Sequence, residues 1–75
     1  MASLSEKLFS LRKKKGLTQE DVAEGAGIVL RSYRRYETGE REPVASTLIK
    51  LADFYGVTID FLVGRTDEET SVSYT

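Results

Sequence analysis

The chain has 75 residues, of which 40% are hydrophobic and 31% charged, and its formal net charge is −1. This length allows one small domain with one modest core. The sequence contains no cysteine and no histidine, which excludes disulfides, thiolate chemistry and the most common zinc ligands. It has no apolar run of the roughly 20 residues that a membrane span needs, and its first ten residues lack a signal-peptide stretch. We therefore expect an intracellular protein with locally packed helices.

The charges are unevenly distributed along the chain. Residues 1–41 hold nine Lys/Arg and six Asp/Glu, whereas residues 42–75 hold two Lys/Arg and six Asp/Glu. Attraction to phosphate depends on the local surface and not on the net charge, so a basic half is compatible with a polyanionic partner. An ordinary solvated charge pattern explains the same asymmetry, and the two interpretations remain open at this point.

The first expected helix begins after Ser3, which has the spacing of a capping box with Glu6, and it ends near Gly16. A core-facing stripe at i, i+4 and i+7 is formed by Leu4, Leu8 and Leu11. The basic run at residues 12–15 falls in the last turn, where cations favour the helix dipole. Phe9 lies beside the stripe, and we expect it to add a core contact.

Residues 18–39 are predicted to form two short helices joined by a sharp turn. Thr18 has the spacing to cap the first of them against Asp21, and Gly27 can take the positive φ that ends it. The second is expected from about residue 30 to 37, with Gly39 as its end. At about 100° per residue, its basic sector comprises Leu30, Arg31, Arg34 and Arg35. Its opposite sector offers Tyr33, Tyr36 and Glu37 for burial, with Ser32 at the border. This arrangement is typical of a helix-turn-helix.

The remainder of the chain predicts two more helices. After a polar connection that ends at Pro43, a helix is expected over residues 45–55 and ends at Gly56. Its apolar face comprises Leu48, Leu51, Ala52 and Tyr55. Thr58 can cap a short fifth helix over residues 59–63. We assign residues 1–64 to one domain and residues 65–75 to a polar, loose tail, in which Val72 and Tyr74 give a weak strand signal.

Five stretches of the sequence occur in a recognisable order and register. They are Leu8 to Arg12, Gly16 to Ala23, Ala26 to Ile28, Tyr36 to Pro43 and Thr47 to Leu62. With these stretches the chain resembles the Cro and phage-repressor (Xre-type) helix-turn-helix family over roughly residues 4–64. No single stretch is specific, but the whole string is. The resemblance implies an all-α fold, a compact five-helix bundle, that binds double-stranded DNA through the second helix of the motif, the recognition helix.

The same resemblance implies roles for individual residues. Gln19 matches a glutamine that contacts phosphate and supports the recognition helix, and Thr18, just before it, is grouped with the DNA-binding positions. Base-facing positions are matched by Leu30, Arg31 and Arg35, with Ser32 and Arg34 beside them and Arg34 directed to phosphate. The loop along the phosphates is matched by Thr38, Gly39 and Arg41. Arg12 and Glu37 match an ion pair, Ala23 a small residue at the helix crossing, and Gly27 the turn.

The chain departs from the family pattern at four positions. Val29 and Val44 stand where Ser or Thr usually caps a helix, and a lost cap costs about 1 kcal/mol. Gly25 lies inside a helix, where it costs roughly 0.5–1 kcal/mol relative to Ala. Leu30 replaces a more common polar residue; it lacks a hydrogen-bonding group for a base edge but can pack on a thymine methyl. These departures affect the expected affinity and operator more than the fold.

The functional and structural interpretations of these residues differ. Taken alone, the three arginines are best explained as a solvated surface of the helix. In the helix-turn-helix register DNA binding is favoured instead, because three arginines on one face repel each other when no polyanion is bound. Gln19 is equally explained as a good helix former. Tyr33 and Tyr36 are expected in the core and not against bases. Glu37 would repel phosphate if it were free, which favours its pairing with Arg12.

We therefore expect a DNA-binding transcriptional regulator, a repressor that binds an inverted repeat as a dimer. Ile59 and Leu62 are expected to face the core, and Phe61, with Val44, is the candidate for the two-fold contact. Packing of Phe61 on its own fourth helix is an equal alternative. The competing function is an antitoxin-like module that binds another protein, with DNA binding secondary. No catalytic, metal or cofactor site and no small-molecule ligand is predicted. The expected location is the cytoplasm, at the nucleoid.

Overall fold

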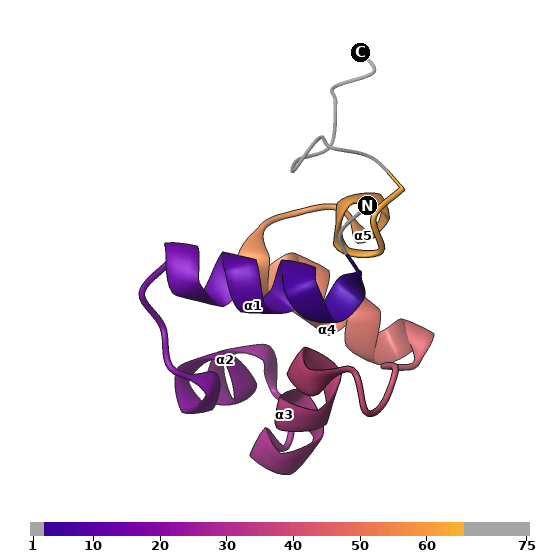
Figure 1. The fold of residues 1–75 in the computed structure, drawn as a ribbon. Helices are drawn as coiled ribbons and strands as arrows, with labels where there is room; N and C mark the ends of the chain where they lie inside the picture. The colour runs from indigo at the N-terminus through magenta and orange to yellow at the C-terminus, as the bar shows by residue number, and fades with distance from the viewer. Residues whose placement is uncertain (1–2, 66–75) are drawn as a thin grey trace.

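The computed structural model describes residues 3–65, and these form five helices joined by short connections (Figure 1). The helices are α1 (Leu4–Lys14), α2 (Gln19–Ala26), α3 (Leu30–Thr38), α4 (Ala45–Tyr55) and α5 (Ile59–Leu62). The expected all-α fold is confirmed over this range, and the predicted helix bounds agree to within one or two residues. Apart from Arg65, the proposed tail lies outside the described residues, and so does its possible strand at Val72 and Tyr74.

The helix starts follow the capping residues of the sequence. Ser3 and Glu6 form a complete capping box on α1, in which each backbone N–H donates to the other side chain. Thr18 and Asp21 do the same on α2, so the shorter aspartate suffices there. The first residues of α3 and α4 follow valines and receive no side-chain cap, as the sequence predicted.

Two glycines make the turns that the motif requires. Gly27 follows α2 with φ 72°, and Gly39 follows α3 with φ 82°. An L side chain in this left-handed region is strained, whereas glycine takes it readily. The turn at Gly27 therefore brings α3 back across α2.

The helices enclose one core. Its buried hydrophobic residues are Leu8, Leu11, Val22, Ala23, Tyr33, Tyr36, Leu51, Ala52, Tyr55, Phe61 and Leu62. They come from all five helices. Leu4 and Ala26 pack against this cluster from its edge, and the apolar face predicted for the first helix is confirmed. In the ribbon, α2 and α3 lie together at one end, and α1 lies between them and α5 (Figure 1).

On α5 Leu62 lies in the core as expected, but Ile59 does not, and for Phe61 the structure supports the alternative of packing within its own chain. Phe61 is 7% exposed and belongs to the core, whereas Ile59 is 39% exposed. At about 100° per residue, Phe61 and Leu62 define the buried sector, and Ile59 and Val63 both fall outside it. Lys7 from α1 lies over the Phe61 ring, with Nζ 3.9 Å from the ring centroid. This contact and the burial of the ring remove Phe61 as a surface contact for a second copy.

Phe9 also departs from its predicted place. Its side chain is 49% exposed and not a core contact. The guanidinium carbon of Arg12 lies 5.5 Å, and the Lys13 ammonium 5.8 Å, from its ring centroid. A cation over an aromatic face is a favourable contact, so the basic last turn of α1 partly covers this ring.

Gly25 is explained by packing between α2 and α4. A Cβ at this position would lie 2.2 Å from Cε1 of Phe54 and 2.9 Å from its Cδ1. No real Cβ tolerates such a contact, so Ala here would displace the Phe54 ring. The cost of a glycine inside α2 is therefore accompanied by a close approach of the Phe54 ring to the α2 backbone.

None of the helices in residues 3–65 combines the length and apolar character needed to cross a membrane.

Candidate nucleic-acid interface

The two faces of α3 differ in burial as its sequence predicted. Tyr33 and Tyr36 are buried, while Arg31 and Arg34 are exposed. Arg35 and Ser32 are half-buried. One side of α3 is thus committed to the core, and the other offers arginine side chains to the surroundings.

Leu30 differs from its expected role. Its side chain is half-buried and packs against the hydrophobic core. It follows Val29, which is exposed and gives no side-chain cap. The first turn of α3 is therefore held by apolar packing of Leu30 in place of a polar cap, and less of the Leu30 side chain is available for a base than the sequence suggested.

An ion pair joins α1 to the last turn of α3. Arg12 Nε donates to Oε2 of Glu37 at 2.7 Å, and Arg12 Nη2 donates to Oε1 at 2.9 Å. The side chains are only 13% and 4% exposed, respectively. Nη1 of Arg12 donates to the carbonyl oxygen of Leu17 at 3.0 Å. The predicted pair is present in the two-pronged geometry that is specific to arginine, and it fixes the end of α3 to α1.

Gln19 adds a third helix to this pair. Its Nε2 donates to Oε1 of Glu37 at 3.3 Å, so the start of α2 also contacts the end of α3. The predicted support of the recognition helix by Gln19 is seen here. One side-chain N–H of Gln19 is not used in this contact and remains available as a hydrogen-bond donor.

The surroundings keep Glu37 ionised. Burial acts to raise the pKa of Glu37, but the hydrogen bonds from Arg12 and Gln19 and the positive charge of Arg12 outweigh it, so the pKa lies below its ordinary value. The pKa of Arg12 is raised by its hydrogen bond to Glu37. Both directions describe one charged pair at neutral pH, and its charge is neutralised internally.

Tyr33 of α3 and Tyr55 of α4 meet inside the core. Their hydroxyl oxygens are 2.8 Å apart, and either one can be the donor. Burial raises the pKa of Tyr33, and the contact with Tyr55 and the negative charge of Glu37 raise it further. The sequence analysis placed both rings in the core but missed this contact. A signal was present: a buried Tyr, unlike Phe, needs a partner for its hydroxyl, and two helices each bury one.

The loop after α3 is fastened to the end of the helix. The backbone N–H groups of Glu40 and Arg41 donate to the carbonyl oxygen of Arg35 at 3.0 and 3.3 Å. The Thr38 hydroxyl lies within hydrogen-bond distance of that same oxygen and of Glu40 Oε2. The hydroxyl proton of Thr38 is thus used within the loop, whereas Arg41 is exposed. Arg41 is the positive side chain that this loop offers.

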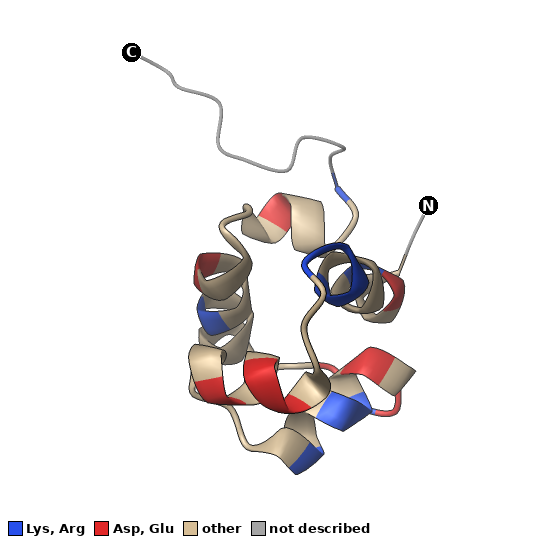
Figure 2. Cartoon of the chain, turned by 90° about the vertical axis from the view of Figure 1, so that its left-hand side faces the viewer, with Lys and Arg blue, Asp and Glu red and all other residues tan. Residues whose placement is uncertain are grey.

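Acidic residues occupy the exposed side of α2. Figure 2 shows this side in red next to the blue arginines of α3. Glu20 and Glu24 are exposed, and the carboxylate of Asp21 is engaged in the α2 capping box. A polyanion is repelled from this surface and attracted to α3.

Within residues 3–65 no cluster of His, Cys, Asp and Glu could hold a metal ion.

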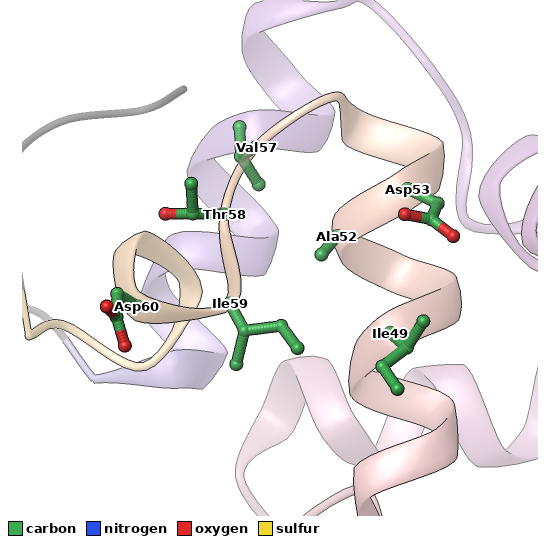
Figure 3. A pocket seen from close by; sticks show the side chains of 7 residues that line it. All are labelled: Ile49, Ala52, Asp53, Val57, Thr58, Ile59 and Asp60. Carbon is green, nitrogen blue, oxygen red and sulfur yellow. The ribbon is translucent and has the colours of Figure 1, made fainter. Parts of the chain in front are cut away.

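A groove of about 320 Å³ lies between α4 and α5 (Figure 3). Ile49 from α4 and Ile59 from α5 line it, together with Val57 in the connection. Ile49 is 49% exposed. Asp53 and Asp60 stand at its edges. This groove is an exposed apolar surface in the described part of the chain.

Comparison with known proteins shows the family to which this fold belongs. Residues 8–62 match the helix-turn-helix family, and the chain belongs to that family. The solved structure of a transcriptional regulator from Listeria innocua superposes with a TM-score of 0.77 at 32% identity, and covers 97% of this chain and 65% of that one. Its similarity extends over all five helices described here.

Two curated relatives are similar in sequence. The cryptic phage CTXphi transcriptional repressor RstR of Vibrio cholerae is 44% identical over 68 residues, which cover 91% of this chain and 60% of the repressor. The transcriptional regulator ImmR of Bacillus subtilis is 38% identical over 63 residues, which cover 84% of this chain and 50% of that protein. The chain thus spans about half to three fifths of their length. Their names describe transcriptional regulators, which are not enzymes.

Proposed function

We propose that this protein is a transcriptional regulator that binds double-stranded DNA through α3. The carrying observation is the division of α3: one side is fixed by Glu37 and Tyr33, and the other exposes Arg31 and Arg34. A helix held in this way can enter the major groove of DNA as a rigid body. Repression is the outcome favoured by the name of the Vibrio cholerae relative. Such a protein acts inside the cell, where the DNA is.

We assign different tasks to the basic residues. Arg31 and Arg35, on the side of α3 away from the core, read base edges, because a guanidinium can contact guanine O6 and N7 together. Phosphates are contacted by Arg34, Arg41 and the remaining side-chain N–H of Gln19, which set position without reading sequence. Thr18, Ser32 and the backbone near Thr38 line the edges of this surface. No small-molecule ligand is part of this proposal.

Selection of bound sequences from random duplex DNA tests the proposal. We expect enrichment of an inverted repeat whose half-sites lie about one helical turn apart, because two recognition helices of a dimer are then about 34 Å apart. Loss of enrichment on replacement of both Arg31 and Arg35 by Ala is the control. An unenriched pool, together with a second protein that co-purifies with the chain, would instead support the antitoxin-like alternative.

The dimer that this site requires is proposed to form through the groove between α4 and α5. Ile49 and Ile59 expose apolar surface there, and this surface replaces Phe61, which is buried. Lys50, exposed beside Ile49 on α4, supplies a cation for Asp53 or Asp60 of a second copy. A two-fold contact places each such pair twice. Val44 is 63% exposed and remains a candidate at the start of α4.

Ile59→Glu is expected to weaken dimerisation while the helical signal and unfolding temperature stay close to those of the wild type. The reason is that a carboxylate at this exposed position meets the acidic edge of the groove in both copies. Sedimentation of the protein free and bound to its selected site measures the effect. Phe9→Glu, at an exposed ring on α1, is the matched control and should leave the mass unchanged. Equal masses for wild type and Ile59→Glu would reject this contact.

A further inference from the structure

We propose that the hydroxyl pair of Tyr33 and Tyr55 is a positioning device that sets how well α3 discriminates between DNA sequences. This inference rests on the proposed DNA-binding function and concerns residues that touch no DNA. Tyr33 is fully buried and Tyr55 is 3% exposed, so neither can contact a base or a phosphate. Any effect of their hydroxyls on recognition has to act through the placement of α3.

Polar contacts hold α3 at two points along its axis. At its end, Glu37 receives hydrogen bonds from Arg12 of α1 and Gln19 of α2. In its middle, Tyr33 is joined to Tyr55 of α4 at 2.8 Å. Four residues separate these points, which is about 6 Å along a helix. A rod held at one point can swing about it, whereas a rod held at two points has a fixed axis.

Apolar packing alone fixes this axis less strictly. Contacts of Tyr36 and Leu30 with the core are non-directional and allow small slides and rotations. A hydrogen bond prescribes both a distance and an angle. The contact between the two hydroxyls therefore limits rotation of α3 against α4. The hydrogen bonds of Arg12 and Gln19 join α3 to α1 and α2, and they do not extend to α4.

The arginines on the other side of α3 depend on this axis. Arg31 and Arg35 lie two residues to either side of Tyr33, so a rotation of α3 at Tyr33 moves both. Bidentate contact with a guanine needs placement to about 0.5 Å. Phosphate attraction tolerates much larger displacements, since it depends on charge and distance. Loss of the hydroxyl pair should consequently reduce specific binding and spare non-specific binding.

The first test is Tyr55→Phe, which removes the α4 hydroxyl and leaves every residue of α3 unchanged. Dissociation constants are measured for the selected site and for a scrambled site, well below the unfolding temperature and with the fold checked by circular dichroism. We expect the ratio of the two constants to fall about tenfold, within the discrimination of one bidentate arginine. Tyr36→Phe is the matched control, because Tyr36 lies on the same buried side of α3 and its hydroxyl is not part of the pair. It should keep the wild-type ratio.

The second test separates placement from stability. The double variant Tyr33→Phe/Tyr55→Phe removes both hydroxyls, so no buried hydroxyl is left without its partner. Part of the stability that the single variant Tyr33→Phe loses should therefore return. We expect its unfolding temperature to rise above that of Tyr33→Phe while the ratio stays low. A ratio that recovers with stability, or a wild-type ratio in Tyr55→Phe, would overturn the proposal. A wild type that binds neither DNA would overturn the DNA-binding function instead, and one that binds both equally would overturn sequence-specific recognition by α3.

Discussion

Arg12→Ala is expected to lower the free energy of unfolding by about 3–5 kcal/mol, as removal of one partner from a buried ion pair generally does. The variant leaves the Glu37 carboxylate, 4% exposed, with the longer Gln19 contact in place of the arginine fork. It also removes the hydrogen bond to the carbonyl oxygen of Leu17. Glu37→Ala should cost less, because the Arg12 guanidinium keeps Leu17 as an acceptor and is more exposed.

Chemical denaturation of the two single variants and the double variant measures the coupling. A pair in direct contact should give a coupling energy of about 0.5–3 kcal/mol. Glu42→Ala, at an exposed carboxylate, is the control and should change stability by no more than about 0.5 kcal/mol. Strictly additive losses from Arg12→Ala and Glu37→Ala would show that the contact contributes nothing as a pair.

The same pair predicts a dependence on pH. The folded-state pKa of Glu37 lies below its ordinary value, so its contribution is present above the unfolded pKa of about 4.3. As the pH falls through the folded pKa, the carboxylate is protonated and that contribution is lost. Wild type should therefore be more stable than Glu37→Gln at neutral pH, and this difference in unfolding free energy should disappear at acidic pH, as denaturation curves at both pH values measure. A gap that persists at the acidic end would argue against an ionised Glu37 in the folded protein.

Arg31→Ala and Arg35→Ala are expected to bring operator and random DNA closer in affinity, each by roughly 1–3 kcal/mol at particular base pairs. Arg41→Ala should instead weaken both kinds of binding alike and reduce the salt slope by about one unit. The difference follows from position. Arg31 and Arg35 lie on α3, whereas Arg41 lies in the loop fastened to the Arg35 carbonyl oxygen.

Titrations against the selected and the scrambled site at several salt concentrations distinguish these effects. Arg65→Ala removes an exposed cation just after α5 and serves as the charge control, with little change expected in either affinity. Equal losses for both DNAs in Arg31→Ala and Arg35→Ala would mean that α3 is only an electrostatic patch. In that case the assignment of these two residues to bases would fail while the phosphate contacts stand.

Much of this fold follows from local signals that residues carry wherever they are placed. Ser3 and Thr18 satisfy the free N–H groups at helix starts, and Gly27 and Gly39 accept a backbone that other residues resist. The period of about 3.6 residues places Tyr33 inward and Arg31 outward on α3. Such signals depend on a few neighbouring residues, which is why the helix bounds, the two faces of α3 and the family were predictable.

Longer-range outcomes needed more than this. The Arg12–Glu37 pair came from the family register and not from periodicity, because the two residues are 25 positions apart in the sequence. Helix α5 has only four residues, which give too little periodicity to predict which side of it faces the core. Packing against side chains of the neighbouring helices determines that Phe61 is buried and Ile59 exposed. The same limit applies to Phe9, whose exposure depends on where α3 and α5 leave α1 uncovered.

Five helices, their caps and an arginine face could be predicted from the amino-acid sequence, because each of these depends on backbone geometry and local periodicity. The contact of Tyr33 with Tyr55, the hydrogen bond of Gln19 to the ion pair and the approach of Phe54 to Gly25 became visible only in the folded chain. These contacts depend on distances between helices, which side-chain volumes throughout the core set together. No local pattern carries that information.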